Sequence, residues 1–416
     1  MAEATYILMH RDVETVRFAY DLDAHEVSKV LSVPCAAHAP IAIVDVLGRV
    51  SAFKLNRWWH ERGILASRHH LRSLAGDPGI HSTMTLSEKS FCLCLSDCYW
   101  VNDEANPQNW HEINFFDNDF SEDLQLVPMH VDARGSSCLA RSLSVHDVEQ
   151  RKKWVISHGR RLFMKAGGQR FNQVPYNEVV ATRLHQRLLQ EDDYVSYSLY
   201  RDEMGTYCAS RCLLGKDEEL IPLYDLIRSR RKPAGMNPLA FALARLRMLG
   251  AMSTLSTPSR ELHLVVQRLR ELGIEDPQTF LSKMFTCDYL LANNDRHFCN
   301  FGIIRDAKTL KYKRMAPIYD TGTCLWCSAK TLDKPEDFAY RTKPFRPNGM
   351  EPGKQLVLVD RYEWFDERAL DGFAEEAKAI LDQNPLMPPG RTEAIRQGIE
   401  RNIEQVLAHV ARVRRP

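Results

Sequence analysis

Three oxygen-bearing side chains between residues 290 and 325 have types and spacing that could serve one reaction. The segment ANNDRHFCN contains Asp295 and, five residues later, Asn300, and Asp320 follows in the segment IYDTG. A carboxylate can accept the proton of a hydroxyl group, while carboxylate and amide oxygens are ligands for Mg²⁺. An Asp followed five residues later by an Asn, with an Asp-x-Gly further on, is the spacing that kinases use for these two tasks. The pattern therefore predicts transfer of a phosphoryl group to a hydroxyl.

A lysine and a glutamate upstream could hold the phosphate groups. Lys165 lies near the end of a predicted strand over residues 161–166, and Glu178 opens the predicted helix NEVVATRLHQRLL. A strand lysine paired with a helix glutamate positions the α- and β-phosphates of ATP in protein kinases. Residues of these types also have ordinary uses, since Asp forms turns, a strand-end Lys is solvated, and Glu suits a first helical turn. The order of all five residues on the expected elements favours the catalytic interpretation.

Strand and helix patterns divide the chain into the parts that must position these residues. Residues 1–130 mix strand-like runs with a helical stretch, and we expect a recognition or regulatory module there. Residues 131–215 contain strand pairs around one helix, and residues 216–416 are mainly helical. The prediction is an α+β fold with two lobes, one small and mixed α/β and one mainly helical, preceded by an additional N-terminal α/β module. A ligand would bind in the cleft between the lobes.

Individual elements follow from periodicity and from capping residues. In the N-terminal part we predict strands over Tyr6–Met9 and Ile41–Val46, a helix near Ser51–Gly63, and a strand through FCLCLSDCYW with its thiols on one face. Further strands are predicted over 153–157, 161–166, 194–200, 207–213 and 301–304, with one more ending at Tyr319. Further helices are predicted from an N-cap at Asn177 and over 239–249, 278–292, 365–381 and 392–413.

Four segments, LFMKAGG, PYNEVVATRL, ANNDRHFCNFGII and APIYDTGTCLW, resemble the HipA-like kinases, which are bacterial Ser/Thr kinases distantly related to lipid kinases. The resemblance extends over residues 145–410 and implies a two-lobe kinase that uses ATP and Mg²⁺. It also implies residue roles: Asp295 as catalytic base, Asn300 and Asp320 as Mg²⁺ ligands, Lys165 with Glu178 on the ATP phosphates, His297 as a brace of the catalytic loop, and Cys212, Leu213 and Leu214 as the hinge that meets adenine.

The segment that should cover the phosphates departs from the usual kinase pattern. The stretch SVHDVEQRKKW stands at this place and contains no glycine. Hydroxyl groups, backbone amides and the charges of Lys152 and Lys153 could hold phosphate there instead. The hydroxyls in and before this stretch are candidate autophosphorylation sites: Ser136, Ser137, Ser142 and Ser144.

Composition limits the partner and the compartment. The chain has 416 residues with 55 Lys and Arg against 54 Asp and Glu, and the net charge of +1 argues against nucleic acid or a membrane as the main partner. No apolar run is long enough for a membrane span and no signal peptide is visible, so we expect a cytoplasmic protein with reduced thiols. The clusters Cys92, Cys94, Cys98 and Cys324, Cys327 have metal-like spacing, but no second pair completes a zinc site, which favours structural thiols.

These observations predict an ATP- and Mg²⁺-dependent Ser/Thr kinase that phosphorylates a protein, with autophosphorylation, a toxin-like role and a regulatory protein partner as further expectations. One alternative is a catalytically silent kinase fold that acts as a binding protein, which the glycine-free stretch motivates. Another is a small-molecule or lipid kinase, because phosphoinositide kinases share the D-R-H-x-x-N form of the loop.

Overall fold

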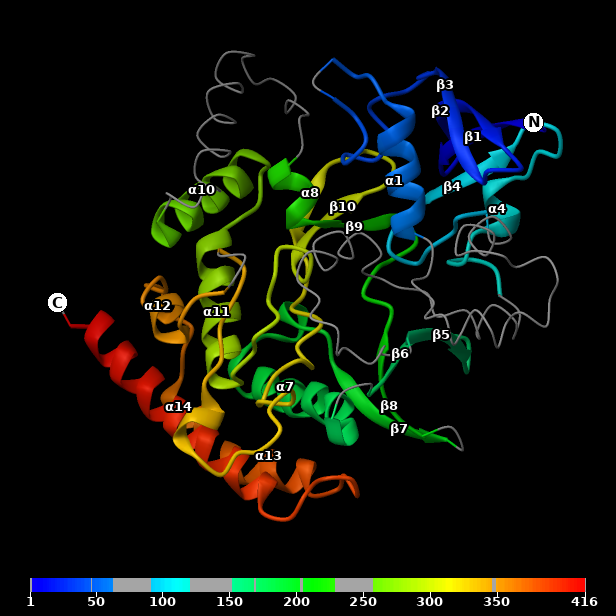
Figure 1. The fold of residues 1–416 in the computed structure, drawn as a ribbon. Coiled ribbons are helices and arrows are strands. Elements are labelled where there is room, and N and C mark those ends of the chain that lie inside the picture. The colour runs from blue at the N-terminus through cyan, green and yellow to red at the C-terminus, as the bar shows by residue number, and fades with distance from the viewer. Residues whose placement is uncertain are drawn as a thin grey trace.

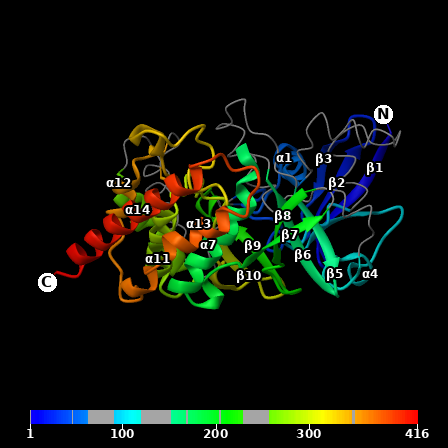
Figure 2. The ribbon, with the colours of Figure 1, turned by 90° about the horizontal axis from the view of Figure 1, so that it is seen from below.

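The computed structural model describes residues 2–45, 47–62, 91–119, 152–167, 170–202, 205–228, 257–345 and 349–415. Within these ranges the fold is mixed α/β, with antiparallel sheets and with its longest helix, α14 (Arg391–Val413), at the C-terminal end (Figure 1). The N-terminal sheet and the C-terminal helix lie at opposite ends of the molecule in Figures 1 and 2. None of the described helices has the length and apolarity that crossing a bilayer requires.

The N-terminal sheet has the strand order β3-β2-β1-β4, and helix α1 packs against β3. The elements of this part are β1 (Glu3–His10), β2 (Val13–Asp21), β3 (Glu26–Ser32), α1 (Ala52–Arg62), β4 (Tyr99–Asp103) and the short helix α4 (Trp110–Ile113). Successive side chains of a strand point to opposite faces. Leu8 of β1 therefore lies in one buried core with Trp58 and Trp59 of α1. Ile7 and Met9 lie in a different core, which this sheet shares with the next one.

Two predicted strands of the N-terminal part are corrected by the structure. Residues 41–43 form turns, and Val44 pairs with Val50 only through an isolated bridge. In FCLCLSDCYW the backbone turns at Phe91 and Cys92, whose φ angles are 52° and 57°, and the strand begins only at Tyr99. Cys92 and Cys98 consequently lie in two different buried cores, and Cys94 is partly exposed, so the three thiols do not share one strand face. Across the described ranges there is no disulfide and no group of three His, Cys, Asp or Glu side chains arranged to hold a metal.

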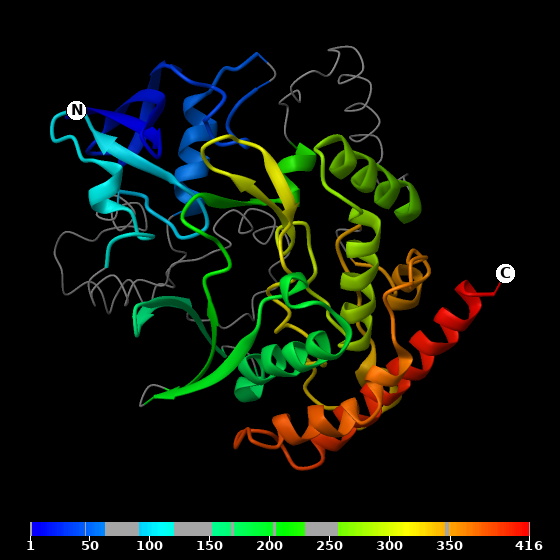
Figure 3. The same cartoon turned by 180° about the vertical axis from the view of Figure 1, so that it is seen from behind.

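A second sheet, with the strand order β5-β6-β8-β7, packs against helix α7 (Figure 3). Its elements are β5 (Lys152–Ser157), β6 (Arg160–Ala166), α7 (Val174–Leu188), β7 (Tyr197–Asp202) and β8 (Gly205–Arg211). The predicted strand pairs are confirmed, but the helix begins before the predicted cap at Asn177. Pro175 fits its first turn, where a backbone N–H has no helical partner. Val180 and Leu184 of the predicted apolar stripe are buried.

A third sheet has three strands in the order β11-β10-β9. Its strands are β9 (Glu218–Pro222), β10 (Gly302–Asp306) and β11 (Tyr312–Met315), and helix α8 (Leu223–Arg228) follows β9. The strand predicted to end at Tyr319 ends at Met315 instead. Arg305 Nε donates to Oε1 of the buried Glu219 at 2.6 Å, and its guanidinium also donates to the hydroxyl of Tyr99 at 2.9 Å. This buried network joins β4 to β9 and β10.

The rest of the described chain is mainly helical. Its helices are α10 (Pro258–Glu271), α11 (Pro277–Leu290), α12 (Pro352–Leu356), α13 (Phe373–Leu381) and α14 (Arg391–Val413). Helices α11 and α14 confirm the predictions over 278–292 and 392–413. The helix predicted over 365–381 is interrupted, because Gly372 adopts a φ of 70° after a 3-10 turn over Glu367–Leu370. The helix predicted over 239–249 lies outside the described residues.

Candidate active site

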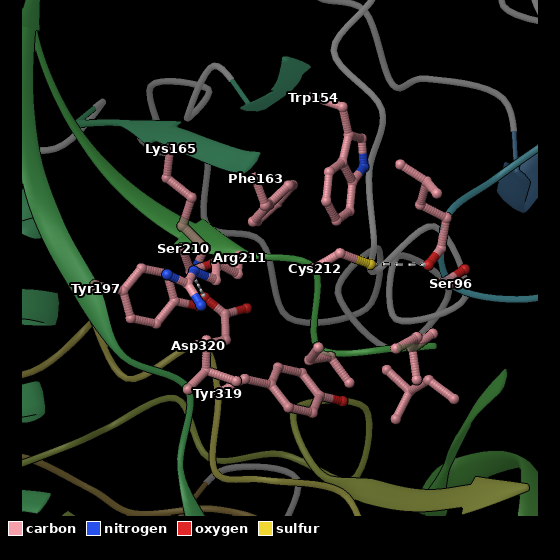
Figure 4. A pocket seen from close by; sticks show the side chains of 15 residues that line it. Ser96, Trp154, Phe163, Lys165, Tyr197, Ser210, Arg211, Cys212, Tyr319 and Asp320 are labelled. Carbon is pink, nitrogen blue, oxygen red and sulfur yellow. Dashed lines mark hydrogen bonds and ion pairs between the residues drawn. The ribbon is translucent and has the colours of Figure 1, made fainter. Parts of the chain in front are cut away.

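Lys165, Glu178 and Asp320 meet in one charged cluster, and Figure 4 shows Lys165 beside Asp320. The Nζ atom of Lys165 lies 2.7 Å from Oε1 of Glu178 and 2.5 Å from Oδ1 of Asp320. The side chains of Lys165 and Glu178 are only 2% and 1% exposed. Burial opposes the ammonium form, but the carboxylates of Asp320 and Glu178 outweigh burial, so the pKa of Lys165 lies well above its usual value. The structure thus brings together three of the residues that the sequence analysis selected.

The first turn of α7 holds the segment that carries Asp320. The side-chain amide of Asn177 donates to the carbonyls of Gly322 and Cys324, each at 2.8 Å. The backbone N–H of Thr321 donates to Oε2 of Glu178 at 3.2 Å. Gly322 fits closely here, since a Cβ atom on it would lie 2.7 Å from Cγ1 of Val174. The sequence analysis took Asn177 for a helix cap, and its link to residues 322–324 was missed because it spans 145 positions.

Asp295 and Asn300 lie in the same loop and are hydrogen-bonded to each other. The side-chain amide of Asn300 donates to the backbone carbonyl of Asp295 at 3.0 Å. The Oδ1 atom of Asn300 is buried without a hydrogen-bond partner in the described structure. A buried oxygen of this kind needs a ligand or solvent partner, and an amide oxygen suits Mg²⁺. The buried oxygen of Asn300 therefore has the chemistry of the magnesium ligand that the sequence analysis predicts at this position.

A buried ion pair, which the sequence analysis missed, joins this loop to the Asp320 segment. The guanidinium of Arg296 donates to both carboxylate oxygens of Asp288, at 2.9 and 3.0 Å. It also donates to the backbone carbonyls of Asn300 at 2.8 Å and of Tyr319 at 2.6 Å, and to the hydroxyl of Thr321 at 2.9 Å. Arg296 therefore fixes both loops relative to α11, the helix that carries Asp288. The sequence did contain one signal for this pair, namely the acidic Asp288 within the apolar helix sequence QTFLSKMFTCDYLLA.

Two further side chains lie beside Asp295. His297 Nδ1 accepts the backbone N–H of Cys299 at 3.2 Å, and its Nε2 lies 3.9 Å from Oδ1 of Asp295. Burial lowers the pKa of His297, which favours the neutral ring that this acceptor role requires. Lys343, which the sequence analysis did not select, donates from Nζ to the same Oδ1 atom at 2.8 Å.

A pocket opens beside the Lys165 cluster (Figure 4). Cys212, Leu213 and Leu214, the predicted hinge residues, line it. The other lining residues are mostly apolar and come from three parts of the chain: Leu95, Ser96, Trp154, Phe163, Lys165, Val195, Tyr197, Ser210, Arg211, Leu220, Tyr319 and Asp320. A slot with apolar walls and a lysine at one side has the chemistry to hold a flat aromatic ring joined to phosphate groups.

The N-terminal part supplies one wall of this pocket, which the sequence analysis did not foresee. Leu95 and Ser96 line the pocket from the segment that precedes β4. The carbonyl of Ser96 accepts the backbone N–H of Leu220 at 2.9 Å. The thiol of Cys212 lies 3.9 Å from the carbonyl of Leu95, a contact drawn in Figure 4. Leu95 also shares a buried core with Trp154 and other residues of the second sheet.

The remaining selected residues lie outside the described part of the structure. They are the side chains of Lys152 and Lys153, and the four serines Ser136, Ser137, Ser142 and Ser144. The predicted domain boundary near residue 130 also lies outside it.

No protein-family model matches this chain, and no curated protein matches it. Among solved structures, it is similar to the proinflammatory kinase CtkA of Helicobacter pylori, with a TM-score of 0.45 and 17% identity, over 63% of this chain and 94% of that one. It is also similar to HipA of Shewanella oneidensis MR-1, from a toxin–antitoxin complex of HipA, HipB and operator DNA, with a TM-score of 0.49 and 14% identity over 99% of each chain.

Proposed function

We propose that this chain is an ATP- and Mg²⁺-dependent Ser/Thr protein kinase with a HipA-like, two-lobe organisation. The observation that carries the proposal is the cluster of Lys165, Glu178 and Asp320 beside an apolar pocket. A buried lysine between a helix glutamate and the Asp of an Asp-x-Gly segment is the arrangement that kinases use to hold ATP phosphates. In the proposed organisation, residues 131–215 form the small lobe, residues 216–416 the helical lobe, and residues 1–130 a recognition or regulatory module.

Nucleotide binding follows from the lining of the pocket. Adenine would lie in the apolar slot against the hinge residues Cys212, Leu213 and Leu214, with its edge toward their backbone. The Lys165 ammonium would contact the phosphates, and Glu178 would keep that ammonium in place. Mg²⁺, held by Asn300 and Asp320, would neutralise the charge on the phosphates.

Asp295 would orient the acceptor hydroxyl of a Ser or Thr side chain and accept its proton. The hydroxyl oxygen forms a bond to the γ-phosphorus as the bond from that phosphorus to the bridging oxygen breaks, and ADP leaves with the electron pair. The loop is held for this step by the bond from Asn300 to the carbonyl of Asp295 and by Arg296. His297 braces the loop through its bond from Cys299.

The acceptor is a protein hydroxyl in this proposal, and a serine of this chain is one candidate. A regulatory protein partner would act through residues 1–130, as part of a toxin–antitoxin pair in the cytoplasm. Lipid and small-molecule acceptors would use the same cluster, so the experiment must include them.

Transfer of label from γ-labelled ATP tests the proposal. The wild-type chain should label itself or a protein in a cell lysate in the presence of Mg²⁺, and Asp295→Ala should abolish this labelling. Asp333→Ala is the matched control, because Asp333 is an exposed aspartate outside the cluster. Equal labelling by the wild type and by Asp295→Ala contradicts the catalytic assignment.

A second readout separates the kinase from a silent kinase fold. If no acceptor is labelled and Mg-ATP does not raise the unfolding temperature of the wild type, the chain is a binding protein without phosphoryl transfer. Label recovered in a lipid or small-molecule extract rather than in protein would mean that the acceptor is a lipid or a small molecule and not a protein.

A further inference from the structure

Lys343 pairs with the carboxylate that would serve as the base. Its Nζ atom donates to Oδ1 of Asp295 at 2.8 Å, and the two side chains are 22% and 25% exposed. The ring of His297 lies further off, with Nε2 at 3.9 Å from the same oxygen. Lys343 lies 48 positions after Asp295 and well beyond the Asp320 segment. No motif that the sequence analysis used includes it.

The backbone around Lys343 is held firmly, so the pair is more than a chance surface contact. Thr342 and Met350 exchange two backbone hydrogen bonds of 2.8 Å. The carbonyl of Lys343 accepts the side-chain amide of the buried Gln355 at 2.6 Å. Surface ion pairs between mobile side chains contribute little, but a pair with a fixed backbone loses less entropy on forming.

Packing anchors the same segment to the loop of Asp295. Phe345 is buried, and its ring lies edge-on to Phe298, with the centroids 5.9 Å apart. Phe298 belongs to the loop between Asp295 and Asn300. The ring of Phe345 also contacts Phe285 of α11, at 5.8 Å between centroids. The position of Lys343 is therefore set by aromatic contacts with the loop on which it acts.

The place of this lysine matters because of where charge develops during transfer. In the transition state the phosphoryl group is loosely bonded to the attacking oxygen and to the leaving oxygen, which lie roughly in line on either side of it. Negative charge spreads over the other three oxygens of the phosphoryl group. The base lies beside the attacking oxygen, so a cation bonded to the base lies at the acceptor side of that group. Lys165, in contrast, pairs with Glu178 and Asp320 at the nucleotide side.

We propose that Lys343 is a catalytic residue, whose ammonium bridges the Asp295 carboxylate and an oxygen of the phosphoryl group during transfer. This inference rests on the proposed kinase function. The proton of the acceptor hydroxyl goes to Asp295, the oxygen–phosphorus bond forms, and the bond to ADP breaks. Lys343 keeps its proton throughout and acts by its charge alone. Its charge stabilises the transition state more than the bound substrate.

Substitution of Lys343 tests this role through the separation of kcat from KM. Lys343→Met should lower kcat about 100-fold, the usual effect of removing one transition-state donor, and leave the KM for ATP nearly unchanged. Lys343→Arg keeps the charge and should recover much of the rate. Lys354→Met is the control, because Lys354 lies in the same region, is 69% exposed and pairs with Glu351.

Lys343→Gln separates the loss of the charge from a loss of folding. The glutamine amide can still donate a hydrogen bond to Asp295, but it carries no charge. This variant should unfold at the wild-type temperature, keep the stabilisation by Mg-ATP, and transfer phosphate as slowly as Lys343→Met. Wild-type kcat in a folded Gln or Met variant overturns the inference, as does a loss that appears only in the KM for ATP. A rise in kcat also overturns it, because Lys343 would then restrain Asp295 in an inhibited state. Failure of the proposed function itself would be recognised separately, by equal labelling in the wild type and in Asp295→Ala.

Discussion

Asp288 and Arg296 form a buried ion pair that supports the candidate active site. Their side chains are 2% and 1% exposed. Asp288 lies on α11, and Arg296 lies in the loop between Asp295 and Asn300. Through this one guanidinium the helix holds the carbonyls of Asn300 and Tyr319, which belong to the two loops that carry the candidate magnesium ligands.

Asp288→Asn should destabilise the fold strongly, because it leaves the Arg296 guanidinium buried without a countercharge. Breaking a buried pair from one side costs about 3–5 kcal/mol. Unfolding by urea measures this loss. Glu351→Gln is the control, since Glu351 and Lys354 are 66% and 69% exposed and their pair should contribute less than about 1 kcal/mol. Equal losses for the two variants would show that the buried pair has no special part in holding the loops.

Gly322→Ala should impair phosphoryl transfer by pushing the Asp320 segment away from α7. The added Cβ atom would lie 2.7 Å from Val174 Cγ1, closer than real Cβ contacts come, and 3.0 Å from Glu178 Cγ, which is tight. Overpacking of this kind costs about 1–3 kcal/mol. Gly353→Ala is the control, because nothing lies within 4 Å of the Cβ position there. The double variant Gly322→Ala with Val174→Ala should recover activity, and no recovery would mean that the crowding lies elsewhere.

Ser96→Phe should weaken nucleotide binding from within the N-terminal part of the chain. A phenyl ring at this position would fill the pocket between the hinge and Lys165, which Ser96 lines. The stabilisation by Mg-ATP, measured as the rise in the unfolding temperature of each protein over the same protein without nucleotide, should be smaller in this variant than in the wild type. Ser198→Phe is the control. Ser198 is exposed and follows Tyr197, a pocket residue, on β7, so its side chain points to the face of the sheet away from the pocket. Undiminished Mg-ATP stabilisation in Ser96→Phe would place the nucleotide elsewhere.

Stability should fall as the pH drops below neutrality, in part because of His185. Burial lowers the pKa of His185 from 6.5 to about 3, so the ring stays neutral in the folded chain while it takes up a proton in the unfolded chain. The unfolded state binds more protons between these two values, and stability is lost as the pH falls through this window. The loss for this group should be about 2 kcal/mol between pH 7 and pH 5.

His185→Gln tests this dependence, since glutamine stays neutral at every pH. The difference in the free energy of unfolding between the variant and the wild type should shift in favour of the variant as the pH falls from 7 to 5. The comparison removes the contributions of the other titrating groups, which both proteins share. A difference that is constant over this range would mean that His185 takes up its proton in the folded state as well.

Local patterns in the sequence were sufficient for helices α7, α11 and α14 and for the strand pairs around α7, whereas helix α10 was not predicted. Two predicted elements were wrong at places where the backbone adopts a positive φ angle. Gly372 breaks the helix predicted over 365–381, because its positive φ ends the helical path. The alternation in FCLCLSDCYW favours a strand, but the positive φ angles at Phe91 and Cys92 turn the chain before Tyr99. Such backbone conformations depend on contacts that periodicity does not record.

The sequence by itself determined the order and chemical types of the candidate residues. Lys165, Glu178 and Asp320 stand out in the sequence alone, since their types suit one reaction and each follows a recognisable element. Only the tertiary structure decided what surrounds them. The wall formed by Leu95 and Ser96, and the contact of Lys343 with Asp295, join segments that are distant along the chain. Such contacts arise from packing between elements, and packing leaves no periodic or motif-like trace in a single sequence.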